Sequence, residues 1–426
     1  MSINKIVKLT FFLFVILFTG CVMEQPDLFS GSPAERLNKA IKNDTDSLQH
    51  AGNGWEMEYF ATTGSAGYTL LVKFSPSGQA IISGKSELTG NLLVTDSCLY
   101  EMIGDNGPVL TFNSYNKVLH AFSNPVNPDG YGLEGDYEFV VLKTTSNQIL
   151  LKGKKRGTII VMNKIPATVS WKQYFDNLDA MNAFLFNGST NSLNLVSGND
   201  TLVASFGATH IFRITKPGED PKVTGTDVPF IVTDYGLRFQ TTDTINTNSS
   251  QNFKLSDNKK LLVSTENPAV YFTGPVLNKF LYSDLSLWKA DGLQMSNDFV
   301  LSIKVLSDAL NLKYAGKRDF EYIAVANKPV YGNSFLIHVT GVDAIFRVVF
   351  SPVSGTSDRI TISLPLDNIN LYDNNGKKFY TEVPEIKTTL TAFCGDYVVT
   401  SELPLNVKTV KYTRVSNPSS YFTVIK

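Results

Sequence analysis

The sequence contains few of the residues that build metal centres and redox sites. Its 426 residues include three cysteines and four histidines, and the histidines are at least 70 positions apart, at His50, His120, His210 and His338. No His-Glu-x-x-His segment and no pair of cysteines at zinc-ligand spacing occurs. The sequence therefore predicts no metal site and no cofactor.

The motifs of common hydrolytic enzymes are also missing. No Gly-x-Ser-x-Gly segment is present to hold a serine nucleophile on a tight turn. Aspartate and glutamate are plentiful, but pairing two carboxyl groups across a cleft depends on the three-dimensional structure. The sequence thus assigns no catalytic residue, and a carboxylate-dependent hydrolase stays open as an alternative.

The chain has no excess of either charge. It carries 38 Lys and Arg against 39 Asp and Glu, a formal net charge of -1. A partner attracted by charge, nucleic acid above all, would need a strongly basic surface. We therefore expect no binding to nucleic acid.

Long hydrophobic runs are confined to Leu9–Phe18, which is ten residues long. A membrane-spanning helix needs roughly 20. Two lysines precede this run, and two small residues follow it before Cys21. This layout is typical of a bacterial lipoprotein signal, so residues 1–20 are predicted to be removed and Cys21 to be acylated. Residues 21–31 then form a tether.

Cys98 and Cys394 are the other two cysteines. An oxidising cell envelope would permit a disulfide between them. They lie far apart in the sequence, however, so two separately buried thiols and one disulfide both remain open.

What the sequence does contain favours strands. It has 28 Phe, 18 Tyr and 30 Gly, a composition typical of strands joined by tight turns. The chain is too long for one hydrophobic core. We predict a mainly β protein, with an antiparallel β-meander or barrel-like N-terminal region, a few helices and a C-terminal β-sandwich-like domain. The predicted segments are an N-terminal helix with a β-meander (32–165), a helix with strands packed on that domain (166–260), and a β-rich C-terminal domain (261–426).

Local signals place several elements. Ser32-Pro33-Ala34-Glu35 predicts the start of a helix that runs to about Gln49, since Ser32 and Glu35 can form a capping box. Apolar and acidic residues alternate over Trp55–Tyr59, which predicts a half-buried strand with Trp55 in the core. Aromatic residues at helical spacing predict an amphipathic helix in 168–186. A segment rich in Asn, Ser and Thr (241–260) is the predicted linker.

Short apolar runs predict further strands. They include Lys117–Phe122, Phe299–Leu306 and Thr388–Phe393. Because the last two fall in a region of many such runs, they contribute to the predicted C-terminal sandwich.

One loop is a candidate binding site. The segment from Asn127 to Glu134 is long, polar and rich in glycine within an otherwise tight meander. Its candidate ligand-binding residues are Asn127, Asp129, Tyr131 and Glu134. The alternative is an ordinary surface loop.

A series of short segments occurs in a familiar order: Gly54–Phe60, Gly67–Leu70, Val109–Phe112, Tyr115–His120, Gly135–Phe139, Leu151–Lys155, Pro229–Thr233 and Gly236–Phe239. The series resembles a family of Bacteroidetes lipoproteins catalogued as domain of unknown function 4302. The resemblance implies an accessory lipoprotein encoded near a SusC/SusD-type outer-membrane importer. It supplies no catalytic residues, because the family has none agreed.

We therefore expect a lipoprotein of the outer membrane or cell surface, anchored by its N-terminal lipid. Its expected role is non-enzymatic binding of a small molecule, glycan or peptide for a SusC/SusD-type TonB-dependent importer. A lipid-anchored hydrolase of glycan or peptide is the first alternative. Capture of haem or metal is the second, with His120 and Tyr131 as the first candidates.

Overall fold

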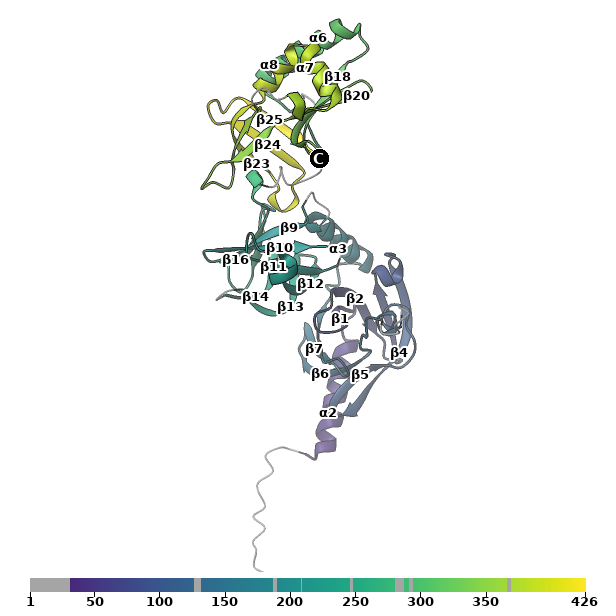
Figure 1. Ribbon diagram of the computed structural model, residues 1–426. Coiled ribbons are helices and arrows are strands. Elements are labelled where there is room, and N and C mark those ends of the chain that lie inside the picture. Colours follow the sequence, from purple (N-terminus) through teal and green to yellow (C-terminus); the bar gives the residue numbers. More distant parts are fainter. Residues whose placement is uncertain are drawn as a thin grey trace, which may run out of the picture.

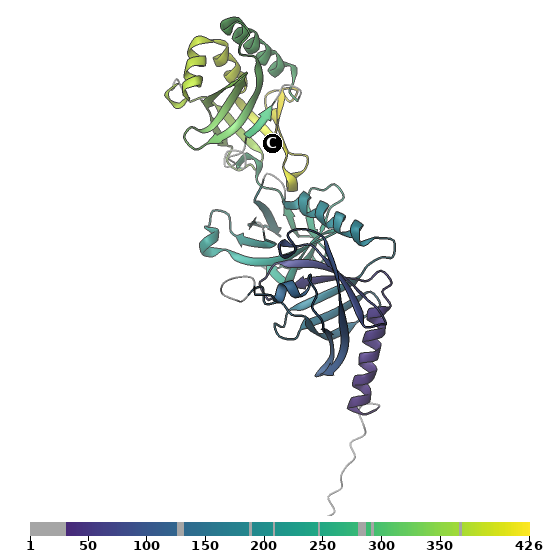
Figure 2. The ribbon, with the colours of Figure 1, turned by 90° about the vertical axis from the view of Figure 1, so that its right-hand side faces the viewer.

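The computed structural model describes residues 31–125, 132–186, 190–207, 209–245, 248–279, 287–290, 294–365 and 369–426. Three β-rich units follow one another along the chain (Figures 1 and 2). Two are closed antiparallel barrels and the third is an open sheet covered by helices. The predicted mainly β fold class, with a barrel-like N-terminal region, is confirmed.

The first described helix, α2 (Pro33–Gln49), begins at the predicted residue. The Ser32 hydroxyl accepts a hydrogen bond from the Glu35 N–H at 3.2 Å, and the Glu35 carboxylate accepts one from the Ser32 N–H at 2.7 Å. This reciprocal capping box satisfies two N–H groups that the first helical turn would otherwise leave unpaired.

The first barrel contains eight strands that pair in sequence order, and β1 closes the barrel by pairing with β8. They are β1 (Trp55–Phe60), β2 (Gly67–Phe74), β3 (Gln79–Gly84), β4 (Val94–Asp105), β5 (Gly107–Phe112), β6 (Glu138–Thr144), β7 (Gln148–Gly153) and β8 (Ile159–Lys164), with the short helix η1 (Glu87–Thr89) after β3. Trp55 is 1% exposed, as predicted, and its indole N–H donates to the Leu48 carbonyl at 2.9 Å.

The prediction of a strand at Lys117–Phe122 is wrong. The segment enters a turn and a short helix, η2 (His120–Ser123). The Asn116 side-chain oxygen accepts hydrogen bonds from the N–H groups of Val118 and Leu119, at 2.9 and 3.0 Å. This local bonding competes with strand pairing, and it places Val118 and Leu119 in the core of the first barrel.

Helix α3 (Trp171–Phe186) lies within its predicted range and leads into a second closed barrel. Its elements are β9 (Ser192–Ser197), β10 (Asp200–Phe206), β11 (Ile211–Thr215), α4 (Pro221–Thr224), β12 (Thr226–Thr233), β13 (Gly236–Ile245), β14 (Asn248–Leu255), β15 (Leu262–Ser264) and β16 (Val270–Thr273). Strand β16 pairs with β9 and closes the barrel.

The structure therefore corrects the predicted linker at 241–260, which is occupied by strands β13 and β14. The barrel also continues through β15 and β16 to Thr273, beyond the expected boundary at residue 260. The polar residues misled the prediction because barrel strands alternate polar outward-facing positions with apolar inward-facing ones. Phe253 and Leu262 from this region are fully buried in the barrel core.

The third unit is one nine-stranded sheet in the order β20-β19-β18-β17-β25-β24-β23-β22-β21. Its elements are β17 (Leu287–Ala290), α6 (Asn297–Tyr314), β18 (Phe320–Lys328), β19 (Gly332–Val339), β20 (Val342–Arg347), β21 (Val349–Pro352), β22 (Arg359–Ser363), η3 (Ile369–Leu371), α7 (Asn374–Glu382), α8 (Glu385–Ala392), β23 (Gly395–Thr400), η4 (Pro404–Asn406), β24 (Thr409–Arg414) and β25 (Tyr421–Ile425). It differs from the expected sandwich because helices, not a second sheet, supply its other layer.

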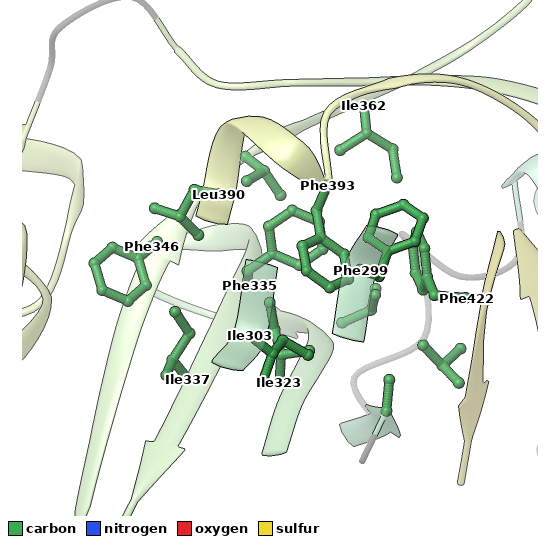
Figure 3. Packing of buried hydrophobic residues seen from close by; sticks show 14 of the residues in the cluster. Phe299, Ile303, Ile323, Phe335, Ile337, Phe346, Ile362, Leu390, Phe393 and Phe422 are labelled. Atoms are coloured by element: carbon green, nitrogen blue, oxygen red, sulfur yellow. The ribbon is translucent and has the colours of Figure 1, made fainter. Parts of the chain in front are cut away.

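Two predicted strands are helices in this unit. Phe299–Leu306 belongs to α6 and Thr388–Phe393 overlaps α8. In α6 the buried residues follow a helical spacing, Phe299, Ile303, Leu306 and Leu310, whereas Leu301, which a strand would bury beside Phe299, is 61% exposed. Figure 3 shows Phe299 and Phe393 meeting Phe335 and Phe422 of the sheet.

The two remaining cysteines are free. Cys98 is buried in the first barrel, and Cys394 is half-buried against the core of the third unit. Within the ranges described above, no helix combines the length and the apolar character needed to cross a bilayer.

Candidate functional site

The acidic face of β1 is buried between the two barrels. Trp55, Met57 and Tyr59 point into the first barrel, so Glu56 and Glu58 point outward. Both glutamates are nevertheless buried, which corrects the half-buried strand expected from the alternating pattern. The outward face is covered by other segments: Arg238 of β13 forms an ion pair with Glu58, and Tyr174 of α3 lies close to Glu56.

The two carboxylates have different partners. Glu58 forms an ion pair with Arg238, and both side chains are almost fully buried. The Asn163 amide of β8 donates to both carboxylates, at 3.3 Å to Glu56 and 3.2 Å to Glu58. The other Glu56 oxygen, Oε1, is buried without a hydrogen-bond partner. Glu58 thus has a cation to balance its charge, while Glu56 does not.

The electrostatics follow from these contacts. Burial, together with repulsion from Glu58, raises the pKa of Glu56 to about 8. Burial also raises the pKa of Glu58, but the positive charge of Arg238 opposes that rise. The ion pair with Arg238 thus favours the charged form of Glu58, whereas Glu56, which has no cation beside it, favours its protonated form.

Beside this cluster a cleft of about 600 Å³ lies between the two barrels. The first barrel contributes Glu58 of β1, residues of β7 and β8, and the turn that joins β7 to β8. The second barrel contributes Tyr235, which lies in the turn between β12 and β13, and residues of β13 and β14. Figure 1 shows β12 and β13 facing β1 and β2. The volume is within the range of small-molecule sites, about 300–1,000 Å³.

A break in the pairing of β13 shapes one wall. The register of β13 with β14 shifts between Arg238 and Asp243, so four residues of β13 lie opposite Gln251. Three of them line the cleft: Gln240, Thr241 and Thr242. A β-bulge redirects side chains in this way and is common near functional sites.

Hydrogen bonds hold the barrels together around the cleft. The Gln240 amide donates to the Thr62 carbonyl at 2.9 Å, and its oxygen accepts from the Gly64 N–H at 2.8 Å. Beyond them, the His210 ring contacts the Gly67 carbonyl at 3.3 Å. The walls are therefore fixed relative to one another before a ligand arrives.

The structure describes only part of the predicted binding loop. Asn127, Asp129 and Tyr131 lie outside the described residues, and so does Cys21. Glu134 is described, and it forms an ion pair with Arg156. Arg156 directly precedes Gly157 and Thr158, which line the cleft, so the structure places the base of this loop next to the cleft wall.

The histidines occupy separate places. His120 stacks on Tyr137 with ring centroids 4.8 Å apart, and its Nδ1 accepts from the Asn116 N–H at 3.1 Å. His338 lies in the third unit between Asp343 and Glu321. In the described part of the chain, no three His, Cys, Asp or Glu side chains are arranged to hold a metal ion.

Sequence reasoning missed the residues of the cleft. In the sequence, Glu56 and Glu58 form only the polar half of an alternating strand, and Arg238 lies in one of the segments that carry the family resemblance. One signal was available: five consecutive polar residues, Gln240 to Thr244, interrupt the alternation of a strand. The register shift of β13 against β14 falls at the start of this run.

Comparisons with known proteins add little about activity. No curated protein matches the chain. Among solved structures, the β subunit of DNA polymerase III from Pseudomonas aeruginosa aligns over 92% of this chain and 97% of its own, at 9% identity and a TM-score of 0.10. A score this low supports no argument from that protein.

The family comparison is informative. The model of the domain of unknown function DUF4302 matches residues 25–257. This range contains the first barrel and α3, and it continues through the β13–β14 hairpin that forms the second wall of the cleft. The match covers more than half of the 426 residues. The chain therefore belongs to the DUF4302 family.

Proposed function

We propose that the protein is a lipid-anchored, non-enzymatic binding protein of the outer membrane, which captures a nutrient ligand for a SusC/SusD-type importer. The cleft between the barrels is the binding site. The anchor is the lipid on Cys21, and the importer is the partner suggested by the family resemblance.

The cleft is the observation that carries this proposal. It is large enough for a small ligand, and its lining combines polar and apolar groups. Its two walls come from different barrels that are joined by the Glu58–Arg238 ion pair and by the Gln240 hydrogen bonds. A preorganised site of this kind binds without losing free energy to ordering its walls.

The anchor and the partner are tested together in the native host. Membranes containing the full chain or Cys21→Ser are fractionated, and the wild-type protein is then purified in detergent under mild conditions. The wild type should stay in the membrane fraction and copurify with an importer, while Cys21→Ser should be released. A Cys21→Ser protein that stays fully membrane-bound would contradict the anchor.

A hydrolase remains the second candidate because of one observation. Glu56 and Glu58 share Asn163 but differ in charge balance, and carboxyl pairs with unequal environments serve as acid and base in glycosidases. Incubation with glycan and peptide pools, followed by mass spectrometry, separates the two functions. We expect bound ligand to be recovered intact. Heat-sensitive cleavage that Glu58→Gln abolishes would favour the hydrolase.

A further inference from the structure

The charges that line the cleft cancel. Among the described lining residues, the charged ones are Glu58 and Arg238, and they are paired with each other. An anionic ligand would have to compete with Glu58 for Arg238, and a cationic ligand would have to compete with Arg238 for Glu58. Either exchange leaves a buried charge without its partner, which is strongly unfavourable. The cleft therefore disfavours a ligand with a net charge.

The remaining polar lining consists of groups that both donate and accept hydrogen bonds. Carboxamides and hydroxyls dominate it, including Gln148, Asn252, Thr63, Thr241 and Thr242. Ligand hydroxyls also donate and accept, so they match such a surface in either direction. A ligand dense in hydroxyl groups thus fits the lining better than one dominated by acceptors alone.

Apolar surface accompanies these polar groups. Leu150, Ile159 and Val161 line the first-barrel wall, and Tyr235, a residue that is 38% exposed, contributes an aromatic ring. An amphipathic ring such as tyrosine offers an apolar face with a polar tip. A sugar ring has the complementary form, since its C–H groups make an apolar face and its hydroxyls make a polar rim.

The backbone of the cleft argues against a peptide. Peptides commonly bind by adding a strand to a free sheet edge. The strands that border this cleft, β1, β7, β8, β13 and β14, are each paired on both sides. At the bulge, the side-chain amide of Gln251 donates to the backbone carbonyls of Phe239 and Gln240. The Glu266 carboxylate accepts from the backbone N–H of Asn252. These backbone groups are already occupied.

From this combination we infer that the cleft binds a neutral oligosaccharide, with its hydroxyls on the carboxamides and threonines and one sugar ring on Tyr235. The inference rests on the ligand-binding function proposed above and names its ligand class.

Calorimetric titration of the full chain in detergent tests it with defined probes. The neutral probes are maltotriose, cellotriose, xylotriose and mannotriose. Trigalacturonate is the charged counterpart, and tetra-alanine is the peptide. We expect at least one neutral sugar to bind and both other probes to fail. Because the neutral sugar carries no net charge, the affinity of the protein for it should change by less than about twofold between roughly 50 and 500 mM salt.

Substitutions locate the binding. Tyr235→Ala should weaken binding of the neutral sugar by about tenfold or more, the equivalent of one lost ring contact. Tyr115→Ala is the matched control, since Tyr115 is 57% exposed in the first barrel and does not line the cleft. Thermal melting of each variant checks that it is folded.

The outcomes separate this inference from the proposed function. If trigalacturonate or tetra-alanine binds most tightly, the assignment of a neutral oligosaccharide is wrong. It is also wrong if Tyr235→Ala and Tyr115→Ala bind the sugar with equal affinity. A wild-type protein that copurifies with an importer but binds none of the sugars also overturns the class, while leaving the proposed function standing.

Discussion

The two barrels share a strand plan but differ in how their interiors are completed. Each contains eight antiparallel strands in sequence order. The core of the first barrel is completed from nearby in the sequence, by Leu48 of α2 and by Leu119 and Phe122 beside β5. The core of the second includes Leu405 of η4, which belongs to the third unit. Figure 1 shows the yellow segment between β23 and β24 reaching β9.

The difference indicates how independent each barrel is. The whole core of the first barrel comes from residues 48–162. The first barrel therefore has its own hydrophobic core, as a unit that folds independently requires. The second barrel is filled largely by phenylalanines, among them Phe212, Phe230 and Phe272, but it needs a residue more than 130 positions after its last strand. Its stability therefore depends on the third unit.

The largest effect should come from Trp55→Ala in the first barrel. The substitution removes a side chain that is 1% exposed and its hydrogen bond to the Leu48 carbonyl. We expect a loss of about 3–5 kcal/mol in the free energy of unfolding. Hydrogen exchange should rise in β1 to β8 while the second barrel stays protected. Leu99→Ala, at an exposed position, is the control. Equal loss of protection in both barrels would refute the independence of the first.

Leu405→Ala should give the next largest effect. Leu405 is fully buried in the second barrel's core, so its truncation should cost about 2–5 kcal/mol. The informative result is where the protein loses protection: amide hydrogen exchange should rise in β9 and β16 of the second barrel, although the substitution lies in the third unit. Leu312→Ala, an 88% exposed position on α6, should change nothing. If exchange rises only in the nine-stranded sheet, η4 does not support the second barrel.

The effect with the smallest slope per step concerns the interface of the two barrels and its pH dependence. Folding raises the pKa of Glu56 from 4.5 to about 8, so between these values the folded protein keeps a proton that the unfolded chain has lost. Stability should therefore fall as pH rises through this window, by up to about 1.4 kcal/mol per pH unit from this group.

Glu56→Gln removes this titration, so the free energy of unfolding should fall less steeply with rising pH. Urea unfolding at about pH 5, 6, 7 and 8 measures this slope. Glu219→Gln, at an exposed position, is the control and should leave the slope unchanged. An identical slope in wild type and Glu56→Gln would show that this carboxyl is not protonated in the folded state.

Parts of the fold could be predicted because their causes are local. The capping box of α2 involves residues three apart, and the burial of Trp55 follows from alternation within one strand. The helical identity of Phe299–Leu306 was less accessible, since a short apolar run fits a buried strand as well as a buried helix. Packing of Phe299 on Phe393 and Phe422 decides between them.

The sequence by itself determined the β-rich fold class, the start of α2, the position of α3 and the expectation of a lipid on Cys21, since each follows from neighbouring residues. Only the tertiary structure decided that β1 is buried on both faces and that a cleft forms beside it. The physical reason is distance along the chain: Arg238, which neutralises Glu58, lies 180 positions away. No local pattern in Trp55–Phe60 predicts that the second barrel covers the acidic face of this strand.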